Sequence, residues 1–314
     1  MNQVSFFEGS KPLKISKPIR LVELFAGIGA QAKALENLGV PFEHYRICEF
    51  DKYAVASYNA VHGTNFKTSD ITQITADDLA ITDTDKYCYI MTYSFPCTDL
   101  SVAGAQKGMS RDGGTRSGLL WQVERLLNEM TELPQILLME NVPQVISEKF
   151  ISDFAEWIGF LDRKGYQSKY ALLNSKDYGM PQNRERCFMV SWLGDFYYDF
   201  PKPSPLKRRL ADMLDQEVDE KWYLDMDSVY LYSHSVNAER EREREKYRGR
   251  SDAEGEVAWT DIPGTLFLSE PSILVMGTTR PNKKIQQRER IFHSLGIICT
   301  LTATDYKDPP KVLT

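Results

Sequence analysis

The sequence predicts an α/β protein with a doubly wound, mostly parallel sheet and a second, smaller and irregular domain. Short apolar runs alternate with amphipathic stretches from residue 19 to about residue 193. A glycine-rich turn follows the first apolar run directly, and beyond residue 193 prolines and basic clusters replace the alternation. Strands that alternate with helices are typical of a parallel sheet with helices on both faces. We therefore place one domain at residues 1–195 and the other at residues 196–314.

The elements of the first domain follow from the apolar runs and from the residues that end helices. Buried strands are expected at residues 19–25, 45–50, 87–94, 136–140 and 187–192. Amphipathic helices are expected at residues 30–38, 52–61, 117–130 and 150–164. Gly39 and Gly63 follow the first two helices as stop signals, because glycine adopts the left-handed conformation that ends a helix. In the second domain, Pro201, Pro203 and Pro205 interrupt regular structure.

Composition excludes several classes of protein. Of 314 residues, 42% are hydrophobic and 26% charged, which is ordinary for a soluble globular chain. No apolar run reaches the length of a membrane span, and residues 1–18 lack a signal-peptide pattern, so we expect a cytoplasmic protein without a membrane partner. Five scattered cysteines without a Cys-x-x-Cys pair argue against disulfides and structural zinc. Four histidines without metal-ligand spacing lead us to expect no metal.

Charge is informative only where it clusters. The net charge of −6 does not by itself indicate nucleic-acid binding. The second domain nevertheless carries Lys207-Arg208-Arg209, and it carries a second basic set that comprises Arg280, Lys283, Lys284, Arg288 and Arg290. Such clusters could contact a phosphate backbone.

A nucleoside-binding pattern follows the first strand. The segment Phe25-Ala26-Gly27-Ile28-Gly29 runs from that strand into a helix, and Glu49 lies twenty residues past Gly29, at the end of the second strand. Glycines allow a tight turn and close approach of a ligand, and a carboxylate at this position can accept hydrogen bonds from ribose hydroxyls. An incidental turn is the alternative for the glycine pair alone. The third glycine of a dinucleotide fingerprint is missing, which favours a smaller nucleoside cofactor than NAD.

Asp70 follows a third short apolar segment and could reach the amino group of an adenine. The alternative is that Asp70 caps a helix or a turn, and spacing alone does not separate the two.

Reactive side chains lie at the ends of two further strands. Cys97 follows the strand at 87–94 on a polar loop in which Pro96 restricts the backbone, which favours a nucleophile over a buried, inert thiol. Glu140 ends the strand at 136–140, where a partly apolar pocket would raise the pKa of its carboxyl and allow it to donate a proton. As an alternative, Glu140 caps the next helix.

Arg184 and Arg186 alternate, so in an extended chain both side chains lie on one face. Two guanidinium groups on one face suit a phosphate or a base carbonyl. Solvent exposure, the usual environment of arginine, is the alternative.

Taken in order, these motifs resemble those of the bacterial and phage DNA cytosine-5 methyltransferases. The matching pieces span roughly residues 20–193, and the ordered set is far more specific than any single piece. They are Phe25-Ala26-Gly27-Ile28-Gly29, Glu49, Asp70, Pro96-Cys97, Thr115-Arg116-Ser117-Gly118-Leu119-Leu120, Glu140-Asn141-Val142 and Gln182-x-Arg184-x-Arg186.

The resemblance implies an S-adenosylmethionine-dependent methyltransferase fold and a reaction. A methyl group would pass from S-adenosylmethionine to carbon 5 of a flipped-out cytosine in a specific double-stranded DNA sequence, through a covalent adduct with Cys97. Glu140 would contact ring nitrogen 3 and the exocyclic amine, and Arg184 and Arg186 would hold the ring carbonyl and the surroundings of Cys97. The implied cofactor-binding residues are Phe25, Ala26, Gly27, Ile28, Gly29, Glu49, Phe50, Asp70, Ile71, Pro96 and Leu119. For the apolar ones, plain core packing is the alternative.

The chain also departs from the family pattern. Residues 195–300 correspond in position to the variable target-recognition domain, but the Arg-x-Leu-Thr-x-x-Glu and Gly-Asn-Ser-Val segments that normally follow are not found. We therefore expect a chain truncated before the usual C-terminal helix, or one half of a split enzyme whose second subunit supplies that end. The remaining alternatives are a catalytically silent binding or regulatory protein, an RNA cytosine methyltransferase and, as a distant third, a nicotinamide dehydrogenase, which leaves the loops at Cys97 and Glu140 unexplained. Membership of a restriction-modification system is a further implication of the resemblance.

Overall fold

The structure, a computed structural model, divides into two compact units that we describe separately. The structure describes residues 11–100, 107–111, 114–215, 217, 230–231, 275–278, 290–293, 298–299 and 311–313. The first unit comprises Met1–Leu173 and Glu185–Pro201, and the second comprises Asn174–Arg184 and Lys202–Thr314. The chain thus passes from the first unit into the second at residue 174, returns to the first at residue 185 and passes into the second again at residue 202. The assignment of one domain to catalysis and of the other to target recognition stays a prediction.

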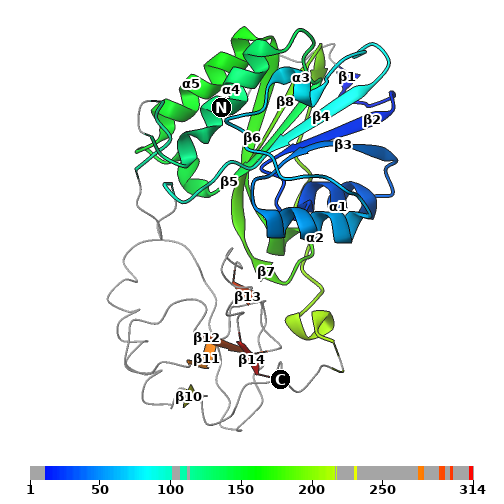
Figure 1. Cartoon of the computed structure of the whole chain (residues 1–314). Helices are drawn as coiled ribbons and strands as arrows, with labels where there is room; N and C mark the ends of the chain where they lie inside the picture. The colour runs from blue at the N-terminus through cyan, green and yellow to red at the C-terminus, as the bar shows by residue number, and fades with distance from the viewer. Residues whose placement is uncertain are drawn as a thin grey trace. The chain divides into compact units, whose positions relative to one another are not determined.

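Within the described residues, the first unit is built on a six-stranded sheet with the order β3-β2-β4-β5-β8-β6 (Figure 1). Strand β2 pairs in parallel with β3 and β4, and β4 pairs in parallel with β5. Strand β8 runs antiparallel to β5. The predicted mostly parallel sheet is confirmed. The strands are β2 (Ile19–Leu24), β3 (Phe42–Cys48), β4 (Cys88–Tyr93), β5 (Ile136–Asn141), β6 (Tyr166–Asn174) and β8 (Glu185–Leu193).

The strand register brings the carboxyl ends of four strands to one level. Leu24, which ends β2, pairs with Cys48 at the end of β3 and with Tyr93 at the end of β4. Tyr93 in turn pairs with Met139 of β5. The residues that follow these positions therefore gather along one edge of the sheet, where ligands bind in folds of this kind.

Helices cover both faces of the sheet. Leu21 of β2 lies in an apolar cluster with side chains of α1 (Ala30–Asn37) and α2 (Lys52–His62). Its neighbours Val22 and Leu24 lie in the main core with side chains of α4 (Leu120–Glu129) and α5 (Ile151–Arg163). In Figure 1 these two helix pairs lie on opposite sides of the sheet. The arrangement follows from the alternation of side chains along a strand that is buried on both faces.

Local signals place the helices. Asp51 caps α2 by accepting hydrogen bonds from the backbone amides of Tyr53 and Ala54, and Gly63, with a φ of 64°, ends it. Helix α5 buries Phe154, Trp157, Phe160 and Leu161 along one stripe. Where the structure describes it, the first unit also contains three short helical segments: α3 (Ala76–Leu79), η1 (Ser117–Leu119) and η2 (Pro143–Ile146).

The sequence-based assignment was wrong or shifted at the two edge strands, β3 and β6. Strand β6 was not expected, because only Tyr166 is buried along its nine residues and its other apolar residues are confined to the short run at residues 170–173. Strand β3 begins at Phe42 rather than at Tyr45, and its first residues include the exposed Glu43. Edge strands have one unpaired side and more solvent contact, so their hydrophobic pattern is weak.

The described part of the second unit consists mainly of short strands. Strand β7 (Gln182–Asn183) pairs with β13 (Ile298–Cys299). A second sheet has the order β10-β11-β12-β14, with bounds Tyr230–Leu231, Val275–Thr278, Arg290–His293 and Lys311–Leu313. Two short helices are present, η3 (Ser175–Tyr178) and η4 (Leu210–Met213). Residues 280–288 of the second basic cluster lie outside the described residues.

A last pair of short strands belongs to the first unit. Strand β1 (Lys11–Pro12) pairs in parallel with β9 (Phe196–Tyr197). No helix in the described part of the chain is long and apolar enough to cross a lipid bilayer.

We predict that Gly29→Ala lowers the free energy of unfolding by about 2 to 4 kcal/mol. Gly29 has a φ of 81°, and an added Cβ would clash with His62 and lie 2.6 Å from Cε2 of Tyr58. Gly39→Ala is the control, because Gly39 has a φ of 66° but its Cβ would meet nothing within 4 Å. Urea unfolding measures both variants, and equal losses would contradict the packing around Gly29.

Candidate active site

The turn after β2 is held by a carboxylate at the end of β3. Phe25 and Gly27 have φ angles of 58° and 55°. The amide of Gly27 donates a 2.9 Å hydrogen bond to Oε2 of Glu49, and the amide of Asp51 donates one of 2.9 Å to Oε1. A Cβ at Gly27 would meet nothing within 4 Å, so there is open space beside the turn. The glycine turn and Glu49 are thus adjacent in space, and their contact with a cofactor stays a prediction.

Large apolar side chains flank this hydrogen bond in the sequence. Ile28 is 59% exposed and Phe50 is 76% exposed. Phe25 and Leu119 are partly buried and pack against the main core, whereas Ile71 lies within it. The exposed pair provides apolar surface for a ligand, and the other three fit the core-packing alternative equally well.

Asp70 caps a turn. Its Oδ1 accepts 2.9 Å hydrogen bonds from both the amide and the hydroxyl of Thr72. These bonds, the amide first, lower the pKa of Asp70. The side chain is exposed and lines a pocket of about 350 Å³ together with Arg46, Lys67 and Ser69. The capping alternative is therefore realised, and a contact of Asp70 with a cofactor stays a prediction.

The loop that carries Cys97 is held by two buried side chains. Asn141 donates a 3.0 Å hydrogen bond from Nδ2 to the carbonyl of Phe95, and Ser117 donates a 2.6 Å hydrogen bond from Oγ to the carbonyl of Pro96. The two carbonyls just before Cys97 are thus fixed from β5 and from η1. Cys97 itself is only half-buried, in contrast to Cys48, Cys88 and Cys187, which are buried.

Glu140 lies beside this loop and faces an arginine. It is the last residue but one of β5, and Nε of Arg186 on the neighbouring strand β8 lies 3.3 Å from its Oε1. Both side chains are half-buried. The N-cap of the following helix η2 is Val142, so Glu140 is not the capping residue. A half-buried carboxyl next to a thiol-bearing loop and a guanidinium can orient a polar ring and stabilise charge on it.

Arg184 and Arg186 fall in different units. Arg184 lies between β7 and β8, where its amide donates to Oδ1 of Asn174 over 3.1 Å and its carbonyl accepts from the amide of Ser175. Arg186 lies in β8 of the first unit. The expectation that both side chains share one face stays a prediction.

Sequence reasoning missed the role of Asn141 and Ser117. Both residues stand inside matching motifs, but each bonds a main-chain carbonyl that is distant along the chain. A motif shows which residue types occur together, and it does not show which backbone oxygen a side chain reaches.

Comparison with known proteins identifies the family. The sequence profile described as C-5 cytosine-specific DNA methylase matches residues 19–297. The chain belongs to this family. It is 33% identical over 267 residues to the orphan methyltransferase M.SssI of Spiroplasma monobiae, a match that covers 68% of this chain and 69% of the relative. It is 31% identical over 259 residues to the Type II methyltransferase M2.ScrFI of Lactococcus lactis subsp. cremoris, with 67% and 71% covered.

A solved structure supports the fold. The methyltransferase EhMeth of Entamoeba histolytica matches with a TM-score of 0.56 at 20% identity, over 68% of this chain and 64% of that one. Each of these matches therefore spans about two thirds of the relative. Family membership makes the chain a DNA cytosine-5 methyltransferase, and the resemblance inferred from the motifs is confirmed.

We predict that a thiol-alkylating reagent at pH 8 labels Cys97 before Cys48, Cys88 or Cys187. Burial raises the pKa of Cys48 to about 11. Burial, followed by the charge of Glu140, raises that of Cys187 to about 12. The thiolate, which is the reactive form, is therefore at least roughly 100-fold scarcer at these two sites than in an ordinary cysteine. Mass spectrometry of labelled peptides measures the rates, with denatured protein as the control. Equal labelling of Cys48 and Cys97 would contradict the described burial.

We predict that Asn141→Ala lowers the free energy of unfolding by about 1 to 3 kcal/mol and speeds alkylation of Cys97, because the Phe95 carbonyl loses its buried donor. Asn59→Ala is the matched control, since Nδ2 of Asn59 also holds a loop carbonyl, that of Phe66, at 2.9 Å. The control should lose stability without a change in the labelling rate of Cys97. If both variants alter that rate alike, Asn141 has no specific hold on the loop.

Proposed function

We propose that this methyltransferase transfers a methyl group from S-adenosylmethionine to carbon 5 of a cytosine in double-stranded DNA, with Cys97 as the nucleophile. The observation that carries the proposal is the hydrogen bond from Asn141 to the Phe95 carbonyl. This bond ties the loop of the half-buried thiol to the strand on which Glu140 stands. A nucleophile and a carboxyl are thereby held at the same edge of the sheet.

The residues after β2 and β3 fit S-adenosylmethionine. Each carboxylate oxygen of Glu49 accepts one backbone amide and retains a further lone pair for a ribose hydroxyl. The space beside Gly27 admits the ligand close to the backbone. Phe25, Ile28 and Phe50 provide the apolar surface. When bound, S-adenosylmethionine supplies an activated methyl group.

The chemistry at the base rests on Cys97 and Glu140. The Cys97 thiolate adds to carbon 6 of cytosine, which makes carbon 5 nucleophilic enough to accept the methyl group. Glu140, carrying a proton, donates it in a hydrogen bond to ring nitrogen 3 and accepts a hydrogen bond from the exocyclic amine, and so stabilises the negative charge that develops on the ring during the attack. Carbon 5 then loses its proton to a solvent base, and the electrons of that bond expel the Cys97 thiolate. Arg186 holds the Glu140 carboxyl in place, and Arg184 contacts the ring carbonyl.

The target cytosine leaves the duplex, because both faces of a stacked base are covered. Lys207, Arg208 and Arg209 contact phosphates, and residues 196–314 read the sequence. The relatives are named Type II and orphan methyltransferases, so pairing with a restriction enzyme and independent action are both open to this chain. Duplex DNA as the substrate implies a cytoplasmic location in a bacterial cell. The similar proteins give no support for the second subunit of a split enzyme.

We predict that Cys97→Ser lowers methyl transfer at least roughly 1000-fold, because the hydroxyl is a far weaker nucleophile. Glu140→Gln should lower it by about 100- to 10,000-fold. Incorporation of tritiated methyl groups into duplex DNA measures activity, and calorimetry with S-adenosylmethionine should give an unchanged affinity for both variants. Cys88→Ser is the control, because Cys88 is a buried thiol at the opposite end of its strand and should be dispensable.

Three results would contradict the proposal. Methylation by Cys97→Ser would exclude the nucleophile, and transfer to RNA rather than to DNA would exclude the substrate. Binding of cofactor and DNA by the unmodified chain without any transfer would support the silent-protein alternative. DNA that contains 5-fluorocytosine tests the adduct directly, since the fluorine cannot leave as a proton. A covalent complex should then accumulate with the unmodified chain and not with Cys97→Ser.

A further inference from the structure

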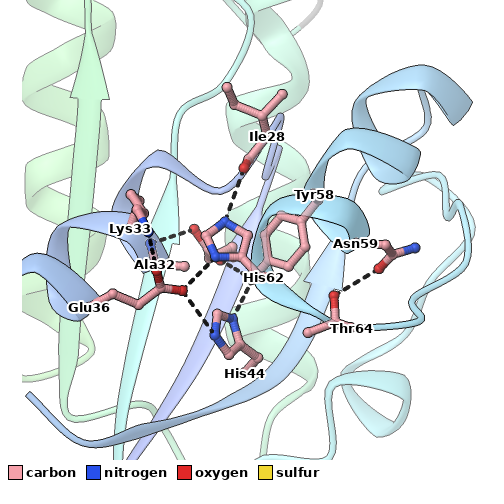
Figure 2. A network of polar contacts seen from close by, with 10 residues as sticks. Ile28, Ala32, Lys33, Glu36, His44, Tyr58, Asn59, His62 and Thr64 are labelled. Carbon is pink, nitrogen blue, oxygen red and sulfur yellow. Dashed lines mark hydrogen bonds and ion pairs between the residues drawn. The ribbon is translucent and has the colours of Figure 1, made fainter.

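A cluster of three potential ligands lies on the face of the sheet covered by α1 and α2 (Figure 2). Glu36 comes from α1, His44 from β3 and His62 from α2. Oε1 of Glu36 lies 2.6 Å from Nδ1 of His62 and 3.6 Å from Nε2 of His44. One ligand atom from each residue lies within 4.8 Å of the others. None of these residues takes part in the proposed methyl transfer.

The outer nitrogens of both rings already have partners. Nε2 of His62 lies 3.1 Å from the carbonyl of Ile28, which can only accept, so this nitrogen carries a proton. Nδ1 of His44 lies 2.9 Å from the hydroxyl of Tyr58. Tyr58 donates its only proton to the buried carboxylate of Glu23 over 2.6 Å, so it must accept from His44. Nδ1 of His44 therefore also carries a proton.

These partners leave the inner nitrogen of each ring facing one point. Nε2 of His44 faces Oε1 of Glu36 at 3.6 Å, and Nδ1 of His62 faces the same oxygen at 2.6 Å. Two ring nitrogens and one carboxylate oxygen therefore converge, and a cation placed between them would contact all three.

We propose that Glu36, His44 and His62 form a binding site for a divalent cation of the zinc class. Two imidazole nitrogens and one carboxylate oxygen are a donor set that zinc favours. Ligating histidines typically donate their other ring N–H to a carbonyl or a polar side chain, as His62 does to Ile28 and His44 does to Tyr58.

The distances and the exposure suit such an ion. Tetrahedral zinc with bonds of about 2.0 to 2.1 Å separates its ligands by about 3.3 Å. The Glu36–His44 distance of 3.6 Å is close to this value, and the Glu36–His62 distance of 2.6 Å lengthens when the ion replaces the hydrogen bond. The His62 side chain is fully buried, whereas those of His44 and Glu36 are 19% and 29% exposed. The open side leaves a fourth position for water. Lys33 bonds the other carboxylate oxygen, Oε2, and leaves Oε1 to the ion.

The ion would connect three elements of the fold. Helix α1, helix α2 and strand β3 each supply one ligand, and His62 extends the connection to the turn at Ile28. The role is structural, because the site holds none of the residues that we place around the cytosine.

Competition titration tests the site on the full chain. The protein is stripped with a chelator, and Zn²⁺ is then titrated in competition with a chromophoric chelator. We expect one ion per chain, with an affinity that falls at least roughly 100-fold in Glu36→Gln and His44→Gln and roughly 10- to 100-fold in Tyr58→Phe. His234→Gln is the control for adventitious histidine binding and should be unchanged. Circular dichroism confirms that each variant is folded.

Co²⁺ distinguishes this site from binding by cysteines. Nitrogen and oxygen ligands in tetrahedral geometry give visible absorption without the near-ultraviolet band that a thiolate ligand adds. Equal Zn²⁺ affinity in the unmodified chain, Glu36→Gln and His44→Gln would overturn the proposal. The cluster would then be a hydrogen-bonded group that binds no metal ion. A thiolate band in the Co²⁺ spectrum would overturn it as well.

Discussion

The parallel register of β2, β3, β4 and β5 is the constraint on which the candidate site depends. Because Leu24, Cys48, Tyr93 and Met139 lie at one level, the next residues of each strand emerge together. Segments that are distant in the sequence thereby come together at one edge of the sheet without any long loop to position them. Side chains then fix the segments that follow these strands. Glu49, after β3, holds the turn after β2, and Asn141, at the end of β5, holds the loop after β4.

Much of this edge could be predicted from sequence, because its signals are local. The glycine turn directly follows an apolar run, and Glu49, Cys97 and Glu140 each stand where such a run ends. The end of a strand can be recognised from neighbouring residues alone, and the parallel pairing of the strands then brings these ends to one edge of the sheet. The same reasoning fails at the sheet edges, where β6 has little apolar pattern to detect. It could not decide between cap and ligand for Asp70, because both uses need the same residue at the same place.

Contacts between distant polar groups were beyond sequence reasoning. Nothing in the spacing of Glu36, His44 and His62 indicates that their side chains meet, since a helix, a strand and another helix each contribute one residue. Glu23 is a further example. It stands among apolar residues in β2, and the sequence predicts only that this strand is buried. The structure shows that the Glu23 carboxylate is itself fully buried, and desolvation raises its pKa. Tyr58 and the amide of Ala32 make this burial tolerable by donating hydrogen bonds to it.

The two amide hydrogen bonds to Glu49 have a thermodynamic consequence. A free glutamate side chain samples many rotamers, and freezing it costs about 1.5 to 2 kcal/mol of conformational entropy. In this protein the Gly27 and Asp51 amides hold both oxygens before any ligand arrives. The entropic cost of ordering this side chain is thus met during folding, and the ribose contact that we propose retains more of its interaction energy as affinity. Preorganisation of one carboxylate by backbone amides links the stability of the glycine turn to the strength of cofactor binding.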